Sequence, residues 1–265
     1  MTYVTTERRG GTQIIRYGNP PRGFLCRAGC RELRQAFEAC AADPDLRVIV
    51  FTGASDAEFI RHFDIAEIIA VGEALASGRV GPEVFEGGDF ARLVNGIAKS
   101  PKIVIAAING VCMGGGLELA LACDIRVVAN RVTQLGLPET RTAVCGGTQR
   151  LPGVIGMGRA LDMILRGTIV DARRAVEIGL VNEGAEDAVA RALEIAHELE
   201  ILLPEVLAAA KACTRQQSEG ALAEGYALEQ RAFAQLLQDG PALDVLRAFQ
   251  AQGADIATFE PPAIT

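Results

Sequence analysis

The sequence predicts an α/β protein with a helical C-terminal region. Short continuous apolar runs alternate with segments of helical periodicity through the first part of the chain, a pattern typical of a sheet covered by helices. From Asp187 onward the pattern is almost entirely helical. A chain of 265 residues suits one large domain or a core with an accessory region. We place the boundary near residue 200 and expect a core at 1–200 and a helical region at 201–265.

The N-terminal elements follow from apolar spacing and from turn residues. Leu33, Phe37 and Cys40 recur at helical spacing, and this helix stops before Asp43 and Pro44. In order we expect a strand at 13–17, a turn at 19–23, a helix at 31–42, a strand at 48–52, a loop at 56–64, a helix at 65–76 and a helix at 90–99. The glycine-rich segment 77–89 is irregular, and we interpret it as a candidate lid.

The same strand–helix–strand pattern then repeats before the helical region begins. We expect strands at 103–108 and 125–128 around a helix at 114–122, followed by helices at 188–203, 205–217, 222–238 and 243–250.

The segment Ile103–Asp124 carries the most information about chemistry. A buried strand is followed by Asn109-Gly110, by the three glycines Gly114–Gly116, and by an apolar helix that holds Glu118. Glycines let backbone N–H groups approach a ligand, and a helix N-terminus adds partial positive charge. Together they suit an oxygen that becomes negative during a reaction. The alternative is simple packing with Glu118 in a salt bridge; P-loop and dinucleotide fingerprints both fit poorly.

Composition excludes several classes of function. The formal net charge of −7 and the absence of a Lys/Arg-rich run disfavour nucleic-acid binding. No apolar run reaches the roughly 18 residues that span a bilayer, and the first residues lack the apolar region of a secretory signal. Seven cysteines and two histidines without ligand spacing favour reduced thiols over a metal site. We therefore expect a cytoplasmic protein with no membrane partner, no nucleic-acid partner and no metal.

Several ordered motifs carry a resemblance to a known family. The glycine segment resembles the signature of the crotonase (enoyl-CoA hydratase/isomerase) superfamily, and the likeness continues through 137–139, 146–151, 175–181 and, more weakly, 45–53. It covers most of 12–182 in the expected order. The resemblance implies a spiral of ββα units, a helical C-terminus that packs in homotrimers or homohexamers, an acyl-CoA substrate, and no cofactor beyond the coenzyme A of that substrate.

The resemblance also implies an oxyanion hole made of two backbone N–H groups. By position these belong to Gly115 and Phe63. The surrounding loop departs from the family pattern, since it keeps Phe59, Asp64 and Glu67 but has Ile60–Phe63 in the middle. His62 replaces a glycine, so a left-handed backbone there is harder to hold, and Phe63 adds bulk beside the acyl group.

The sequence leaves three hypotheses for the role of the His62 side chain. It is an acid/base group near the thioester, because histidine titrates near neutral pH; or it pairs with Asp64 or Glu67; or it is solvated.

Hydratases of this family hold one water between two glutamates, which correspond here to Glu118 and Glu139. Two carboxyls that share a water push their pKa values apart, which supplies one acid and one base. Many isomerase members have only one of these acids. The alternative for Glu139 is an ion pair, for example with Arg141.

Coenzyme A needs cations for its phosphates. Arg22 and Arg27 lie in the loop where relatives contact the CoA head group, and Arg61 and Asp64 are further candidates. The family's C-terminal basic pattern is not reproduced, although Arg247 is a substitute.

We therefore expect an enzyme that adds water to a 2-enoyl-CoA. The alternatives are another reaction on the same fold (enoyl-CoA isomerisation, thioester hydrolysis or C–C hydrolysis of a β-diketone) and a catalytically decayed oligomeric scaffold. A substrate panel separates the reactions, and acyl-CoA binding separates an enzyme from a scaffold.

Overall fold

Two β-sheets organise the chain in the computed structural model, which describes residues 2–85, 87–239, 242–256 and 259. The larger sheet has the order β1-β2-β3-β5-β7-β10, with β1 and β2 antiparallel and the other neighbours parallel. Its strands are β1 (Val4–Arg9), β2 (Thr12–Tyr17), β3 (Val48–Gly53), β5 (Ile103–Ile108), β7 (Ile125–Ala129) and β10 (Glu183–Ala185). The smaller sheet, β4-β6-β8-β9, contains β4 (Glu58–Ile60), β6 (Val111–Met113), β8 (Leu135–Gly136) and β9 (Ile169–Val170).

Successive strands alternate between the two sheets. β3 leads to β4, β5 to β6 and β7 to β8, and the helices α2 (Ile65–Ala76) and α4 (Gly115–Ala122) follow the first two pairs. The expected loop at 56–64 is wrong at Glu58–Ile60, where a three-residue strand pairs with β6. A strand this short has too few residues to show the alternation that marks longer strands.

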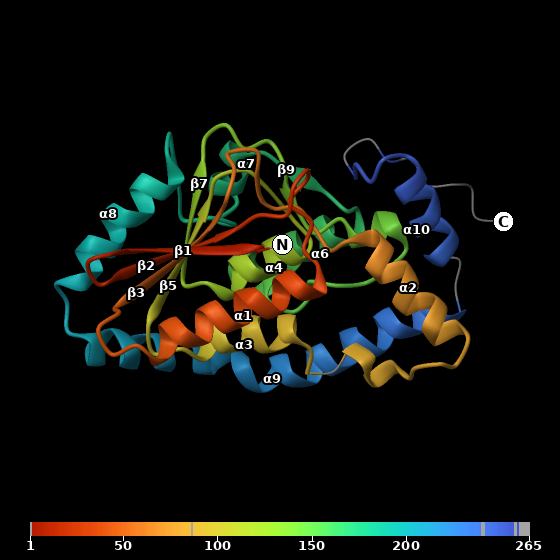
Figure 1. Ribbon diagram of the computed structural model, residues 1–265, viewed down its shortest axis with the longest axis horizontal. Coiled ribbons are helices and arrows are strands. Elements are labelled where there is room, and N and C mark those ends of the chain that lie inside the picture. The colour runs from red at the N-terminus through yellow and green to blue at the C-terminus, as the bar shows by residue number, and fades with distance from the viewer. Residues whose placement is uncertain (1, 86, 240–241, 257–258, 260–265) are drawn as a thin grey trace.

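Helices cover both faces of the larger sheet. Its β3 and β5 strands are buried along their whole length, which explains their continuous apolar sequences. In Figure 1, α8 runs along one side of the sheet, while α1 and α3 lie together on the other. The remaining bounds are α1 (Arg27–Ala42), α3 (Asp89–Lys99), α5 (Leu151–Ile155), α6 (Met157–Leu165), α7 (Ala172–Glu177), α8 (Ala188–Glu200), α9 (Pro204–Asp239) and α10 (Ala242–Ala251), with 3-10 helices η1 (Pro82–Phe85) and η2 (Glu139–Thr142).

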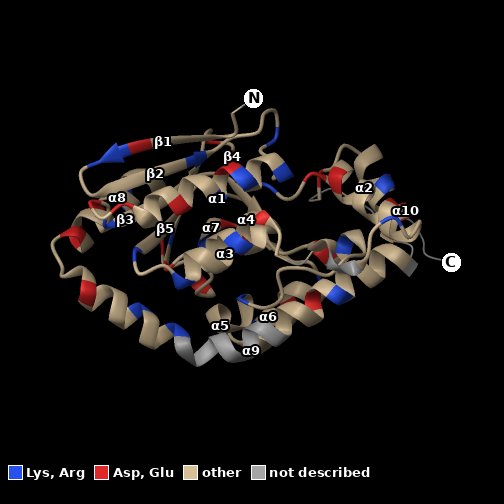
Figure 2. Ribbon diagram, turned by 60° about the horizontal axis from the view of Figure 1, so that its bottom comes forward, with Lys and Arg blue, Asp and Glu red and all other residues tan. Residues whose placement is uncertain are grey.

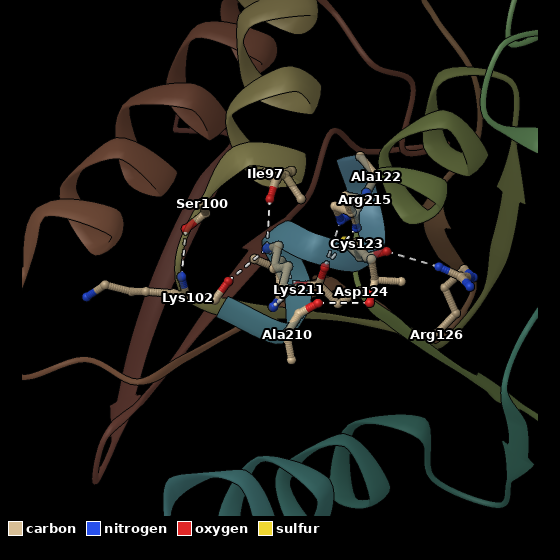
Figure 3. A network of polar contacts seen from close by, with 12 residues as sticks. Ile97, Ser100, Lys102, Ala122, Cys123, Asp124, Arg126, Ala210, Lys211 and Arg215 are labelled. Atoms are coloured by element: carbon tan, nitrogen blue, oxygen red, sulfur yellow. Dashed lines mark hydrogen bonds and ion pairs between the residues drawn. The ribbon is translucent and has the colours of Figure 1, made fainter. Parts of the chain in front are cut away.

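The expected helices at 205–217 and 222–238 are wrong as separate elements, because α9 is one continuous helix. No proline interrupts this stretch, and a glycine inside a helix costs only about 1 kcal/mol. Tertiary contacts also hold α9 to the core. Figure 3 shows Lys211 and Arg215 of α9 converging on Asp124, which lies just beyond the end of α4, with nitrogen–oxygen distances of 2.8 Å each.

A second apolar cluster lies where α2, the end of α9 and α10 meet (Figure 1). Ile65, Ile69 and Leu75 of α2 pack there with Leu237 of α9 and Phe249 of α10. Residues beyond position 200 therefore pack against residues near position 70, and the division into 1–200 and 201–265 stays a prediction.

Basic and acidic residues alternate along the elements of the ribbon in Figure 2. Examples are the exposed ion pairs Asp162–Arg166 and Arg173–Glu177, a kind of contact that contributes little to stability. Across the part of the chain that the structure describes, no helix has the length and apolar character to cross a membrane.

Candidate active site

A cavity of about 1050 Å³ is lined by residues of α1, α2, α3, α4, α9 and α10 and of the loops between them. The predicted residues His62, Phe63, Gly115, Glu118 and Glu139 all line it. They come from three separate stretches of sequence, and the fold brings them together at the start of α4.

The backbone N–H of Phe63 has no acceptor among the described residues. Leu25 pairs with its two neighbours instead: the Leu25 N–H donates to the His62 oxygen at 2.7 Å, and the Asp64 N–H donates to the Leu25 oxygen at 2.8 Å. Because N–H groups alternate sides along an extended chain, this pairing turns the Phe63 N–H away from Leu25. It is available to a ligand.

The N–H of Gly115 is available for a different reason. Gly115 is the first residue of α4, so its N–H has no partner within the helix. The preceding Gly114 has φ 52° and ψ −127°, a left-handed backbone that favours glycine. Gly114 donates its own N–H to the Gly136 oxygen at 3.0 Å, which fixes the turn into the helix.

The side chain of Phe63 packs directly on Gly115. A Cβ placed on Gly115 would lie 2.7 Å from Cε2 of Phe63, closer than any real contact. The edge of Phe90 meets the same ring at a centroid distance of 4.9 Å. Gly115 is therefore required for the close approach of the two loops that carry the free N–H groups.

His62 is held firmly in the wall of the cavity. Its Nδ1–H donates to the Phe63 oxygen at 2.8 Å, and its ring stacks on Phe24 at 4.8 Å and leans on Phe249 at 5.7 Å. Burial lowers the pKa of His62, so the neutral ring is favoured. The backbone at His62 is not left-handed, since among the described non-glycine residues only Ala143 and Ala254 are. A fully solvated His62 is excluded, and an acid/base role stays a prediction.

Glu118 and Glu139 both have strongly shifted pKa values. Desolvation raises the pKa of Glu139 to about 8, and it raises the pKa of Glu118 well above its ordinary value. The charge of Glu139 further raises the pKa of Glu118. Carboxyls in such surroundings keep protons near neutral pH and can donate them.

The expected alternative for Glu139, an ion pair with Arg141, does not form within the described residues. Arg141 donates to the Ile256 oxygen at 3.4 Å, and Oε2 of Glu139 is buried without a partner. Glu118 likewise forms no salt bridge with any described residue. The alternative in which Glu118 is held in a salt bridge is therefore not supported.

Two further groups at the cavity escaped the sequence analysis. Glu229 and Tyr226 reach it from α9, and Glu229 is buried. Tyr226 lies under the guanidinium of Arg150, 5.5 Å from the ring centroid. Only the helical spacing of 226 and 229 was visible in the sequence, and it does not tell which part of the protein the helix covers.

The CoA candidates divide between the cavity and its surroundings. Arg27 and Asp64 line the cavity, and Asp64 also caps α2 by accepting from the Ala66 N–H at 2.9 Å. Arg61 pairs with Glu58 at 3.3 Å, and Arg22 donates to the Gly253 oxygen; neither lines the cavity.

The substitute Arg247 is paired with Glu73 at 2.7 Å and with Asp244 at 3.1 Å. Cations that do line the cavity, and that the sequence analysis missed, are Arg31, Arg92, Lys99 and Arg150. Within the described ranges, no group of three or more His, Cys, Asp or Glu side chains is arranged to hold a metal ion.

Comparison with known proteins agrees with this geometry. The profile of the enoyl-CoA hydratase/isomerase family matches residues 7–250. Human mitochondrial methylglutaconyl-CoA hydratase is 35% identical over 227 residues, covering 82% of this chain but only 65% of the human protein. The mouse mitochondrial enoyl-CoA hydratase domain-containing protein 2 is 32% identical over 260 residues, covering 95% of this chain and 85% of that protein.

A solved structure supports the fold. The crystal structure of an enoyl-CoA hydratase/isomerase from Mycobacterium paratuberculosis superposes with a TM-score of 0.83 at 24% identity, covering 93% of this chain and 98% of the other. The predicted α/β crotonase fold with a helical C-terminal region is thereby confirmed. The chain belongs to the enoyl-CoA hydratase/isomerase family of the crotonase superfamily.

Proposed function

We propose that this protein adds water across the double bond of a 2-enoyl-CoA. The observation that carries the proposal is the meeting of two unpaired N–H groups, from Phe63 and Gly115, with the two carboxyls of Glu118 and Glu139 in one cavity. The chemistry of a thioester enolate needs both parts, since negative charge develops on the carbonyl oxygen while protons move at the neighbouring carbons.

In this proposal the thioester oxygen lies between the N–H groups of Phe63 and Gly115. These donors are fixed by the backbone, so they stabilise the developing oxyanion without reorganising. A water between Glu118 and Glu139 loses a proton to one carboxylate as its oxygen attacks Cβ. The other carboxyl delivers a proton to Cα. The two acids titrate as a pair, so the pair as a whole must hold one proton when the reaction begins.

The cavity wall supports an apolar acyl group. Ile65, Ile68 and Val71 of α2 line it together with Phe233 of α9 and Leu246 of α10. We propose that the acyl chain lies against these side chains, because burying apolar surface stabilises the complex by about 25 cal/mol per Å².

Cations at the rim support binding of the coenzyme A phosphates. Arg27, Arg31, Arg92 and Lys99 line the same cavity, and guanidinium groups form strong hydrogen bonds with phosphate. We retain Arg22 and Arg61 as weaker candidates, since neither lines the cavity. The coenzyme A of the substrate is the only cofactor chemistry in this proposal.

We also propose a homotrimer or homohexamer that works in the cytoplasm. Met157, Leu161 and Leu165 are exposed on α6 at a spacing of four residues, which places one apolar stripe along the helix. A stripe of this kind is suited to burial against a second subunit. The cytoplasmic assignment rests on the free cysteines of the chain, because thiols stay reduced in the cytoplasm.

The test follows the loss of enone absorbance when the protein is added to crotonyl-CoA and to a longer 2-enoyl-CoA. We expect rapid loss, reduced on the order of 10²- to 10⁴-fold in Glu118→Gln and in Glu139→Gln, with acyl-CoA binding by calorimetry nearly unchanged. Full activity in both variants would overturn the proposal. Binding without hydration, together with turnover of a 3-enoyl-CoA, a thioester or a β-diketone, would instead assign another reaction of the fold.

A further inference from the structure

The turn Gly146-Gly147 packs against both proposed acid/base residues. A Cβ on Gly146 would lie 3.6 Å from Cγ of Glu139, and a Cβ on Gly147 would lie 3.3 Å from Cγ of Glu118. Gly147 has φ +68°, a backbone that glycine adopts without strain. The same turn therefore borders the side chains of both Glu118 and Glu139.

The next residue of this turn holds a third acid. The N–H of Thr148 donates to Oε2 of Glu229 at 2.5 Å, and the Thr148 hydroxyl donates to the same oxygen. Glu229 is buried and lines the cavity. Three consecutive turn residues thus lie beside three different glutamates, and the third, Thr148, is hydrogen-bonded to its own.

Helix α9 presents Glu229 on one consistent face. Five of its residues line the cavity. Tyr226, Glu229, Gln230 and Phe233 lie at positions i, i+3, i+4 and i+7, the spacing of a single helix face, and Ala227 lies beside them. Gln230 donates to the Phe85 oxygen at 3.1 Å. Further back on α9, Lys211 and Arg215 attach the helix to Asp124, just beyond the helix that carries Glu118 (Figure 3).

The environment of Glu229 differs from that of the other two acids. Desolvation raises the pKa of Glu229, but the two hydrogen bonds from Thr148 lower it. The charge of Glu229 raises the pKa of both Glu118 and Glu139. The two hydrogen bonds from Thr148 favour the charged form of Glu229. A charge on Glu229 opposes ionisation of the other two acids.

We propose that Glu229 is a positioning residue of the active site: its carboxylate, hydrogen-bonded by Thr148, places a negative charge in the cavity that keeps a proton on the Glu118–Glu139 pair. The proposal rests on the proposed function, because a proton must be present on the pair when the reaction begins. The other titratable groups around this cluster are Cys145, Arg150 and Tyr226.

The test is the pH profile of kcat/KM for wild type and Glu229→Gln, measured on crotonyl-CoA. Glutamine keeps an acceptor for Thr148 and removes the charge. We expect both limbs of the profile to move to lower pH by about one unit, whereas a merely structural role would lower activity without moving the limbs. An unmoved profile in an active wild type would overturn the role of Glu229 and leave the proposed hydration intact.

Three further variants control for misfolding and for general effects of charge. Thr148→Val removes one donor to Glu229 and should give a smaller shift in the same direction, while Thr148→Ser should restore the wild-type profile. Glu205→Gln removes an exposed acid from the same helix and should leave the profile unchanged. A shift in Glu205→Gln as large as that in Glu229→Gln would contradict the proposal.

A measurement that does not depend on activity separates failure of the proposed hydration from failure of the proposed role of Glu229. The infrared carbonyl band of protonated carboxyls is titrated in wild type, Glu229→Gln and Glu139→Gln. We expect a protonated-carboxyl band that persists above neutral pH in wild type and titrates at lower pH in Glu229→Gln. An inactive wild type would refute the proposed hydration, and the infrared titration would still decide the role of Glu229: identical midpoints in wild type and Glu229→Gln would overturn it.

Discussion

Nζ of Lys211 lies 2.8 Å from Oδ2 of Asp124, and this ion pair joins α9 to the end of α4 (Figure 3). Both side chains are largely buried, with 6% and 13% of their surfaces exposed. Nζ also donates to the oxygens of Ile97 at 3.1 Å and of Lys102 at 2.9 Å, so all three ammonium protons have acceptors. The contact fixes the helix that carries Glu229 relative to the helix that carries Glu118.

Removing the carboxylate of this pair should destabilise the protein strongly. In Asp124→Asn the ammonium of Lys211 stays buried without its counter-charge, and Arg215 loses the same partner. Breaking a buried pair from one side typically costs about 3–5 kcal/mol, measurable by urea unfolding. As a control, Asp162→Asn removes an exposed partner of Arg166 and should change stability by less than about 1 kcal/mol. Equal effects of the two variants would contradict the structural importance of the buried pair.

The central strands and α2 were predictable because local pattern and tertiary burial agree there. The runs 48–53 and 103–108 are apolar at nearly every position, as expected for strands with helices on both faces. The helix at Ile65–Ala76 begins immediately after Asp64, whose carboxylate caps it. In each case residues close together in the sequence are enough to predict the strand or the helix.

The strands of the smaller sheet and the place of α9 were not predictable for the opposite reason. β4 and β6 have three residues each, and their stability comes from pairing with each other rather than from their own sequences. The position of Glu229 depends on a hydrogen bond to Thr148, 81 residues away. The two proposed acids could be named from a motif, whereas the third acid becomes visible only when α9 is placed against the core.

Adding one methyl group at Gly115 should impair the proposed oxyanion site. In Gly115→Ala the new Cβ would lie 2.7 Å from the ring of Phe63, which also packs on Phe90. The ring and the Phe63 N–H must then move away from the Gly115 N–H. Loss of one such donor lowers kcat on the order of 10²-fold, which the hydration assay measures.

The matched control for that substitution is Gly158→Ala. Gly158 lies in α6, and nothing lies within 4 Å of an added Cβ. It should leave kcat unchanged and stabilise the helix slightly, by about 0.5–1 kcal/mol. Wild-type turnover in Gly115→Ala would show that the two N–H groups do not act together on the substrate.

Alanine at Gly147 should reduce both stability and turnover. The substitution imposes a left-handed backbone on alanine, which costs about 1–2 kcal/mol, and brings a Cβ within 2.6 Å of the Leu137 side chain and 3.3 Å of Cγ of Glu118. Gly179→Ala is a matched control, because Gly179 has φ +76° but open space around it. Thermal unfolding should show a loss in both variants, larger in Gly147→Ala, and only Gly147→Ala should lose hydration activity.

Equal stability losses at Gly147 and Gly179 with full activity in both would mean that the backbone alone requires glycine in the turn. The contact with Glu118 would then have no part in positioning the acid.

Replacing Glu139 with glutamine should make the protein more stable at alkaline pH. Burial raises the pKa of Glu139 from 4.5 to about 8, so the folded protein binds a proton that the unfolded chain has released. Between these two values the unfolded state binds fewer protons than the folded state, and the free energy of unfolding falls as the pH rises. Above about pH 8 the penalty is complete. Below about pH 4.5 it is absent, because both states are protonated there.

Glu139→Gln mimics the protonated side chain at every pH and so lacks this penalty. Urea unfolding across the pH range should therefore give nearly equal stabilities for variant and wild type in acid, with a difference that grows to a few kcal/mol in favour of the variant in alkali. Glu205→Gln, which removes an exposed acid on α9, should show no such growth. A constant difference between Glu139→Gln and wild type at all pH values would mean that Glu139 ionises equally easily in the folded and unfolded protein. In that event the carboxyl is not desolvated in the cavity, and its ability to hold a proton for catalysis at neutral pH would have to come from the bound substrate instead.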